Sequence, residues 1–402
     1  MRNRQLYYLF LSNFIVLFTG MGLFPLLPLY ATEFGASPAM VGIYFALTYV
    51  FNSAGTILSS WAAQQLTRRG AFIITTSLGV PALFLMGQVS ELWQALLLTA
   101  VVWFSGGMTI MLTSVLTGLH ASDSQRGASF SLMFLAFPLG ALVGGTVMGW
   151  LLSYGYTTLF TTLTAIWLLL PLIGLLLLKD SPLPAASGAA GRNTAQSIAP
   201  PLDSRLHLLM LISLLSSVAI SVSRLGTSMT MQAHAFSAGD IASTATVSGL
   251  LTIPVAFALG AYSDRLGRRT SLAISLTLAA VGALLLVTAT QLWQYWLSAT
   301  LMMIALVSSG AMVTALAADI LPPQALNRGL PLINVMGSIA SILSFGATGY
   351  LLESIGAATL FALAAAIALL ATAAVKRIQP IPAPQPGCDE ALSRLQAEMA
   401  SC

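Results

Sequence analysis

The chain has 402 residues, of which 57% are hydrophobic and only 7% are charged, with a mean hydropathy of +0.88. Soluble domains carry about 25% charged residues, so this composition excludes a soluble protein, and the continuous apolar runs exclude a transmembrane β-barrel. The net charge of +4 does not indicate nucleic-acid binding, because the basic residues form no cluster on a soluble surface. Only two cysteines are present, Cys388 and Cys402 near the C-terminal end, and they indicate neither a disulfide framework nor a metal site.

Breaks at glycine, proline or charged residues divide the chain into twelve apolar segments, each close to the ~20 residues that a helix needs to cross a bilayer. We expect spans near 6–31, 39–63, 71–89, 93–117, 128–153 and 157–178, and then near 206–232, 240–262, 270–289, 292–318, 330–353 and 357–375. This predicts an all-α membrane protein with a six-helix bundle over 1–178, a linker rich in Pro, Ala, Ser and Gly over 179–205, a second six-helix bundle over 206–375, and a cytoplasmic tail over 376–402.

The basic residues predict the orientation of these spans. All Lys and Arg residues except Arg224 fall on one side of the predicted topology, whereas the acids Glu33, Glu91, Asp240 and Glu353 fall on the other. Basic loops stay on the cytoplasmic side, so we predict a multi-pass protein of the cell inner membrane with both termini in the cytoplasm.

Short matches at helix ends reveal an internal repeat with an offset of about 200 residues. Leu92-Trp93-Gln94 recurs as Leu292-Trp293-Gln294, and the pair Arg68-Arg69 recurs as Arg268-Arg269. Because each half has six helices in the same orientation, we expect the halves to be related by a pseudo-twofold axis along the membrane normal.

The loop between the eighth and ninth predicted spans carries the most specific motif, GAYSDRLGRR over 260–269. This loop resembles the signature loop of the major facilitator superfamily, and the resemblance extends to the helix count, the repeat and the linker. It implies a transporter that works by alternating access, with the loop as a conformational gate in which an acid meets a helix N-terminus and arginines meet acids or lipid phosphates. The alternative is that the arginines only set the topology. The candidate gate residues are Gly260, Asp264, Arg265, Gly267, Arg268 and Arg269.

Other segments both match and depart from this family. The corresponding first-half loop carries Gln64 in place of the acid, which predicts a gate that differs between the halves. The fourth span has Trp103 before Ser105-Gly106-Gly107 and lacks the arginine of many proton-coupled members. The segment over 138–149 is similar to the Gly-Pro-rich motif of antiporters, although it also suits ordinary close helix packing. The first span, over 20–28, is similar to drug and sugar efflux members.

Arg224 is the one basic residue inside a predicted span, where such a residue costs roughly 2.5–3.5 kcal/mol at a helix centre. Ser217, Ser221 and Ser228 fall near the same helix face. Arg224 is therefore a candidate for binding a carboxylate, a phosphate or a hydroxyl-rich group. The alternatives are an ion pair with an outer acid, Glu33 or Asp240, and snorkelling to outer water.

Further polar residues in the spans are candidates either for substrate contact or for bonds between and within helices. With Arg224, the candidate substrate-binding residues are Asn13, Asn52, Ser105, Thr109, Ser221, Ser228 and Asn334. No acid falls near the centre of a span, so proton coupling would need groups near the span ends. The candidates are Glu33, Asp240 and His234 on the outer side, with Asp319 at the inner end of the tenth span.

Together these features predict a secondary active transporter, an exporter of a small amphipathic or drug-like compound, with protons as a candidate coupling ion. The alternative is a sugar or organic-anion transporter or facilitator that uses Arg224. The histidines His120, His207 and His234 are scattered, so the sequence indicates no enzyme, cofactor or metal. The predicted partners are the lipid bilayer and the small-molecule substrate, and we expect a monomer.

Overall fold

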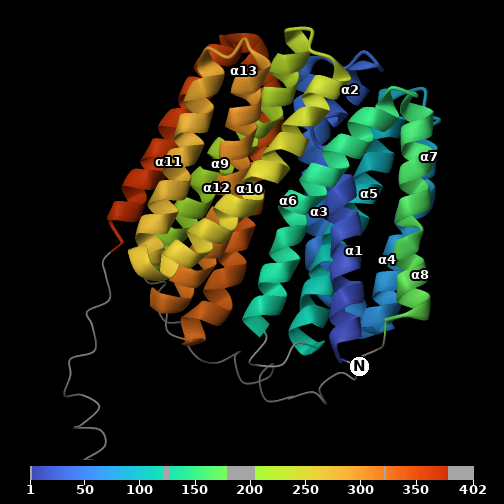
Figure 1. Cartoon of the computed structure of the whole chain (residues 1–402), viewed down its shortest axis with the longest axis horizontal. Coiled ribbons are helices and arrows are strands. Elements are labelled where there is room, and N and C mark those ends of the chain that lie inside the picture. Colours follow the sequence, from blue (N-terminus) through green and yellow to red (C-terminus); the bar gives the residue numbers. More distant parts are fainter. Residues whose placement is uncertain (1, 121–125, 179–203, 321–322, 379–402) are drawn as a thin grey trace, which may run out of the picture.

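A computed structural model of the chain describes residues 2–120, 126–178, 204–320 and 323–378, and that part is a bundle of helices without strands (Figure 1). Most of the predicted linker over 179–205 and of the predicted tail over 376–402 lies outside the described residues. We call the end of the bundle that holds Arg4, Arg68 and Arg268 the inner end, following the predicted orientation. It is the lower end in Figure 1, near the N-terminus.

Eight helices form the N-terminal half. They are α1 (Arg2–Leu23), α2 (Leu27–Thr32), α3 (Pro38–Leu66), α4 (Arg68–Met86), α5 (Leu92–His120), α6 (Arg126–Leu152), α7 (Tyr156–Trp167) and α8 (Leu169–Leu176). Prolines explain why two spans are divided: Pro25 follows α1 and Pro28 lies at the start of α2, and Pro171 cannot donate to Trp167 at the break between α7 and α8. The stretch Tyr156–Leu176 is still one continuous apolar span, so this half has six spans.

The C-terminal half consists of α9 (Ser204–Ala233), α10 (Ala238–Leu266), α11 (Arg268–Val287), α12 (Leu292–Ile320) and α13 (Pro323–Lys376). The last element holds two helices, because Gly356 has a φ of 79° and redirects the chain there. Glycine adopts this left-handed conformation without the clash that a Cβ would cause. With α13 counted as two spans, the described helices provide the six spans of this half and confirm the predicted all-α architecture of twelve.

The internal repeat is visible in individual hydrogen bonds. Asn13 Nδ2 donates to the carbonyl of Met133 at 3.1 Å, and the hydroxyl of Ser213 donates to the carbonyl of Ile333 at 3.1 Å, so the first and fifth spans of each half are joined at equivalent points. A different side chain performs the same task in each half. The repeat therefore preserves the packing of helices within a half.

The two halves meet along two seams that are themselves equivalent, α3 with α13 and α6 with α10. On the first seam the backbone of Gly349 touches that of Pro38, and a Cβ on Gly42 would lie 2.8 Å from the carbonyl oxygen of Phe345. On the second, a Cβ on Gly149 would lie 3.0 Å from the Cβ of Ala242. Because these contacts lie in the outer part of the helices, the outer end of the bundle is closed.

Candidate functional site

A cavity of about 350 Å³ lies near the middle of the bundle, mainly between α1, α3 and α5 of the N-terminal half. It extends from Phe24 and Arg224 on the outer side to Thr56 and Ser114 further inward. The wall is mostly apolar and aromatic, and Arg224 is the one charged residue among the described residues that line it. The lining residues that set this character are Met21, Phe24, Trp103, Ile110, Phe137 and Trp167, with Thr19, Tyr49, Asn52, Thr56 and Ser114 as polar positions.

The position of the cavity follows from small residues on α5. Gly106 and Gly107 line it without side chains, whereas the equivalent positions of α12 carry Leu306 and Val307. On the C-terminal side of Arg224 lies a small cavity of about 40 Å³, lined by Thr227, Ser228, Thr244 and Ser248 among others. Arg224 lines both cavities and so stands between the two halves.

Arg224 is held by aromatic rings from the other half. Its guanidinium carbon lies 4.0 Å from the centroid of the Phe24 ring, a cation–π distance. The Tyr49 hydroxyl interacts with the same guanidinium. Phe24 and Arg224 are equivalent positions of the repeat, and equivalent residues that touch must lie close to the pseudo-twofold axis. Arg224, the basic residue inside a predicted span, is therefore near the symmetry axis.

A cluster of rings closes the cavity toward the outer end. Tyr49 and Phe345 have ring centroids 4.5 Å apart, Phe24 and Phe45 5.2 Å apart, and Phe24 and Phe345 5.9 Å apart. Three of these rings come from the N-terminal half and Phe345 comes from α13. The cluster therefore packs across the seam between the halves and separates the cavity from the outer surface.

Three of the predicted substrate-binding residues line these cavities. Arg224 and Asn52 face the central cavity, and Ser228 faces the small cavity beside Arg224. The Asn52 side-chain amide donates to the carbonyl of Trp103 at 3.2 Å, which ties α3 to α5. Substrate binding by these residues stays a prediction, with a geometry that permits it.

The other predicted positions have local partners. Asn13 bonds to α6, Ser105 donates to the carbonyl of Thr75 at 2.7 Å, and Thr109 donates back to its own helix. The hydroxyls of Ser221 and Ser341 are 3.1 Å apart, and Asn334 is exposed on α13. The structure does not gather these five residues around the central cavity.

The candidate proton-coupling residues lie near the outer end. Glu33 follows α2 and is exposed, Asp240 accepts a hydrogen bond from the hydroxyl of Ser237, and His234 Nδ1 lies 3.0 Å from the Tyr295 hydroxyl. Arg224 forms no ion pair with Glu33 or Asp240 within the described structure, where the recorded ion pair joins Arg268 and Asp319. None of the three candidates is among the residues of the central cavity.

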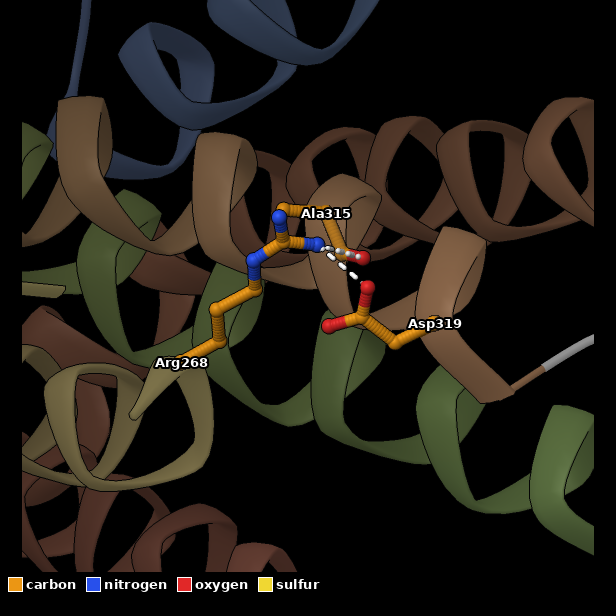
Figure 2. A network of polar contacts seen from close by, with 3 residues as sticks. All are labelled: Arg268, Ala315 and Asp319. Atoms are coloured by element: carbon orange, nitrogen blue, oxygen red, sulfur yellow. Dashed lines mark hydrogen bonds and ion pairs between the residues drawn. The ribbon is translucent and has the colours of Figure 1, made fainter. Parts of the chain in front are cut away.

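The arginines of the signature loop contact groups of their own half. Figure 2 shows Arg268 donating to Asp319 at 2.6 Å and to the carbonyl of Ala315 at 2.8 Å, both on α12. Arg269 donates to the last carbonyls of α13, those of Val375 and Lys376. The side chains of Asp264 and Arg265, like the surroundings of Gly260, lie outside the described part, and Gly267 has a φ of 83° between α10 and α11. The gate role of this loop stays a prediction.

Sequence reasoning missed the aromatic residues of the site. From the sequence we expect the aromatic residues of the spans to pack against other helices or to face lipid. An apolar side chain in an apolar span does not show which side of the helix faces the cavity, and this applies to Phe24, Tyr49, Trp103 and Trp167. Only the repeat offset held a clue, since Phe24 is the equivalent of Arg224. Among the described residues, no cluster of His, Cys, Asp and Glu could hold a metal ion.

Comparisons with known proteins agree with this architecture. The family model of the Major Facilitator Superfamily matches residues 9–234 and 208–400. The multidrug resistance protein MdtG of Klebsiella pneumoniae (strain 342) is 24% identical over 270 residues, 63% of each chain, so this chain spans less than two thirds of that relative. MdtG of Salmonella paratyphi A (strain ATCC 9150 / SARB42) is 24% identical over 307 residues, 72% of this chain and 74% of that protein.

Solved structures of two transporters share the fold at low identity. The nucleoside transporter NupG has a TM-score of 0.76 and 14% identity, covering 92% of this chain and 99% of its own. A POT family transporter in complex with 5-aminolevulinic acid has a TM-score of 0.76 and 14% identity, covering 93% of this chain and 95% of its own. The match of the family model along nearly the whole chain, on a scaffold of twelve spans, shows that the chain belongs to the major facilitator superfamily and is a multi-pass membrane transporter.

Proposed function

We propose that this transporter exports a small amphipathic, drug-like compound by alternating access. The observation that carries the proposal is the central cavity, which combines an apolar and aromatic wall with a single cation, Arg224. Such a wall favours the apolar body of a ligand, and isolated polar groups fix its orientation. The names of the MdtG relatives, multidrug resistance proteins, support the same substrate class.

The cavity also suggests how such a compound would lie. Its volume of about 350 Å³ falls in the range of small-molecule sites, ~300–1,000 Å³. The Arg224 guanidinium carbon lies over the Phe24 ring, 4.0 Å from its centroid, and the guanidinium carries five N–H donors. We expect an anionic or acceptor group of the substrate to meet these donors, while its apolar part packs on Trp103 and Phe137.

Release on the outer side requires the seams between the halves to separate. In the present conformation the outer ends are in contact and the aromatic cluster covers the cavity. Rocking of one half against the other about the axis would uncover the cavity toward the outside, as expected for transporters of this type. Coupling to protons through Glu33, Asp240 or His234 stays a prediction.

A second candidate, an organic-anion or sugar transporter, is favoured by Arg224 together with the polar positions Thr19, Asn52, Thr56 and Ser114. An anion suits the single cation directly. A sugar would need its hydroxyls paired at most positions, because unpaired buried polar groups cost binding energy.

The test is ligand binding by the purified protein in lipid nanodiscs, measured as thermal stabilisation and then as affinity. Ligands that bind only the folded state raise its stability. The panel would contain anionic, neutral and cationic amphiphiles, sugars and small organic acids. The variants would be Arg224→Ala and Arg224→Lys, with Arg268→Ala as an arginine control outside the cavity.

We expect anionic amphiphiles to stabilise the wild type and to bind about 10- to 100-fold more weakly to Arg224→Ala, the loss typical of a hydrogen bond to a charged group. Arg224→Lys should keep part of the affinity and Arg268→Ala nearly all of it. If neutral amphiphiles bind equally to the wild type and to Arg224→Ala, the export proposal holds and the role of Arg224 is structural. Stabilisation by sugars or small acids alone would overturn it.

A further inference from the structure

Glu353, at the outer end of the first span of α13, contacts the other half of the molecule. Its Oε1 accepts a hydrogen bond from the backbone N–H of Ala39 at 3.2 Å. Ala39 lies in the first turn of α3, where backbone N–H groups have no partner inside the helix. The positive end of the helix dipole lies there too, so a carboxylate is favoured at this point. A C-terminal acid thus caps an N-terminal helix.

The equivalent helix of the other half is capped differently. Ser237 and Asp240 at the start of α10 form a reciprocal capping box: the Asp240 carboxylate accepts from the Ser237 backbone N–H at 3.1 Å, and the Ser237 hydroxyl accepts from the Asp240 N–H at 3.1 Å. In α3 the serine is kept as Ser37, but the position of Asp240 is occupied by Met40, whose side chain is 50% exposed. The acid that α3 lacks in its own sequence is supplied by Glu353.

Glu353 has no counterpart of this kind in the repeat. The corresponding turn at the end of α6 carries Ser153, whose hydroxyl donates to the carbonyl of Trp150 in its own helix at 2.7 Å. Among the residues that the structure describes, the carboxylate contact therefore exists on one seam only.

The surroundings of Glu353 belong to the closed outer end. A cavity of about 370 Å³ is lined by Thr32, Gln232, Leu352 and Glu353 among others, and Glu353 is the one charged residue among the lining positions. Gln232 Nε2 donates to the hydroxyl of Thr32 at 2.5 Å, a second polar contact between the halves. Opening of the outer end would break both contacts.

We propose that Glu353 is an outer latch, a carboxylate that binds the N-terminus of α3 while the outer end is closed and returns to water when it opens. The proposal rests on the alternating access of the proposed function but not on the identity of the substrate. Because Glu353 is exposed, both partners are hydrated after opening. The latch therefore biases the conformational equilibrium only modestly. A modest bias suits this contact, because the contact must break in every transport cycle.

The test measures the conformational equilibrium directly, with spin labels at Ser90→Cys and Thr290→Cys after replacement of Cys388 and Cys402 by serine. Ser90 and Thr290 are equivalent, exposed positions in outer loops, and their hydrogen bonds to Gln94 and Gln294 use only backbone N–H groups. Distances between the labels, measured by double electron–electron resonance in nanodiscs, report the open and closed fractions.

Glu353→Gln keeps the shape and an acceptor oxygen but removes the charge, and it should raise the ratio of outward-open to outer-closed molecules about two- to fivefold. Glu353→Ala should raise it further. Met40→Asp gives α3 an acid of its own beside Ser37, so it should displace Glu353 and also raise the ratio. Adding Glu353→Gln to Met40→Asp should then have little further effect, because the two changes remove the same contact.

Ser237→Ala is the matched control, since it removes the hydroxyl that accepts from the Asp240 N–H and so weakens a helix cap that lies within one half. It should lower thermal stability and leave the label distances unchanged. If Glu353→Gln and Met40→Asp also leave the open fraction unchanged, while substrate still shifts it in the wild type, the latch is wrong and alternating access stands. A distance that is identical in all variants, with and without substrate, would overturn alternating access and the latch with it.

Discussion

The N-terminal half encloses most of the central cavity, whereas the C-terminal half contributes Arg224 and a wall of larger side chains. Both halves hold their helices together by equivalent contacts. Arg69 donates to the carbonyls of Gly174 and Leu175 at the end of α8, just as Arg269 donates to the last carbonyls of α13. The repeat has thus kept the contacts that build a six-helix half.

Several differences between the halves lie where a residue faces the other half or the cavity. Gly106 corresponds to Leu306, Phe24 to Arg224, and Met40 to Asp240. These differences place the cavity on one side of the axis, the cation at its edge, and the outer latch on one seam. The comparison separates residues that maintain the scaffold from residues that can vary and so determine what the transporter binds. Three substitutions test this distinction, each replacing a residue of one half by its equivalent in the other half.

The largest effect is expected for Gly55→Val, which copies Val255 into the N-terminal half. A Cβ at Gly55 would overlap the backbone carbonyl of Phe104, so α3 and α5 could not keep their distance. We expect a loss of about 3 kcal/mol or more in the free energy of unfolding, or failure to fold. Thermal unfolding of the purified protein measures this loss. Gly310→Ala, where a Cβ would meet nothing within 4 Å, should be neutral or stabilising. A stable Gly55→Val protein would show that the halves tolerate each other's packing.

An intermediate effect is expected for Gly106→Leu, which copies Leu306 into the cavity wall. A Cβ at Gly106 would lie 3.4 Å from Val16 Cγ1, an ordinary contact, so the protein should fold. The leucine side chain would occupy the cavity, and binding of amphipathic ligands should weaken about 10-fold or more. Isothermal titration in nanodiscs measures the affinity, with Gly20→Ala as a control that adds little volume. Unchanged affinity would place the substrate outside this cavity.

The smallest effect is expected for Asp319→Leu, which copies Leu119 into the C-terminal half and removes the ion pair with Arg268. The two side chains are 39% and 44% exposed, and exposed ion pairs contribute about 0–1 kcal/mol. Unfolding free energy should fall by no more than this, and the difference should shrink at high salt. Thermal unfolding at two ionic strengths measures it. A loss well beyond 1 kcal/mol would give this pair a structural importance that its exposure does not predict.

The spans and the repeat were predictable from the sequence because the bilayer restricts the possible structures. A chain in lipid must satisfy its backbone within helices, and this leaves long apolar runs with breaks between them. Arg224 stood out for a related reason, since a cation in such a run is costly and rare.

The partners of Arg224 were not predictable, because they depend on the rotation of each helix about its own axis. Asn13 and Ser105 have the same polar character as Asn52, yet they bond to neighbouring helices while Asn52 lines the cavity. The role of Glu353 depends on a contact across a seam, and in the sequence it reads only as an acid in an outer loop.

The contact between Phe24 and Arg224 has a consequence for how such a transporter could arise. In a symmetric dimer of one six-helix chain, the position on the twofold axis would carry the same residue from both copies. Two arginines would repel each other there, and two phenylalanines would leave the cavity without a charge. The combination of a ring with a guanidinium at 4.0 Å requires different residues at equivalent positions. A single chain that contains both halves therefore permits an asymmetric centre in a scaffold that is otherwise symmetric.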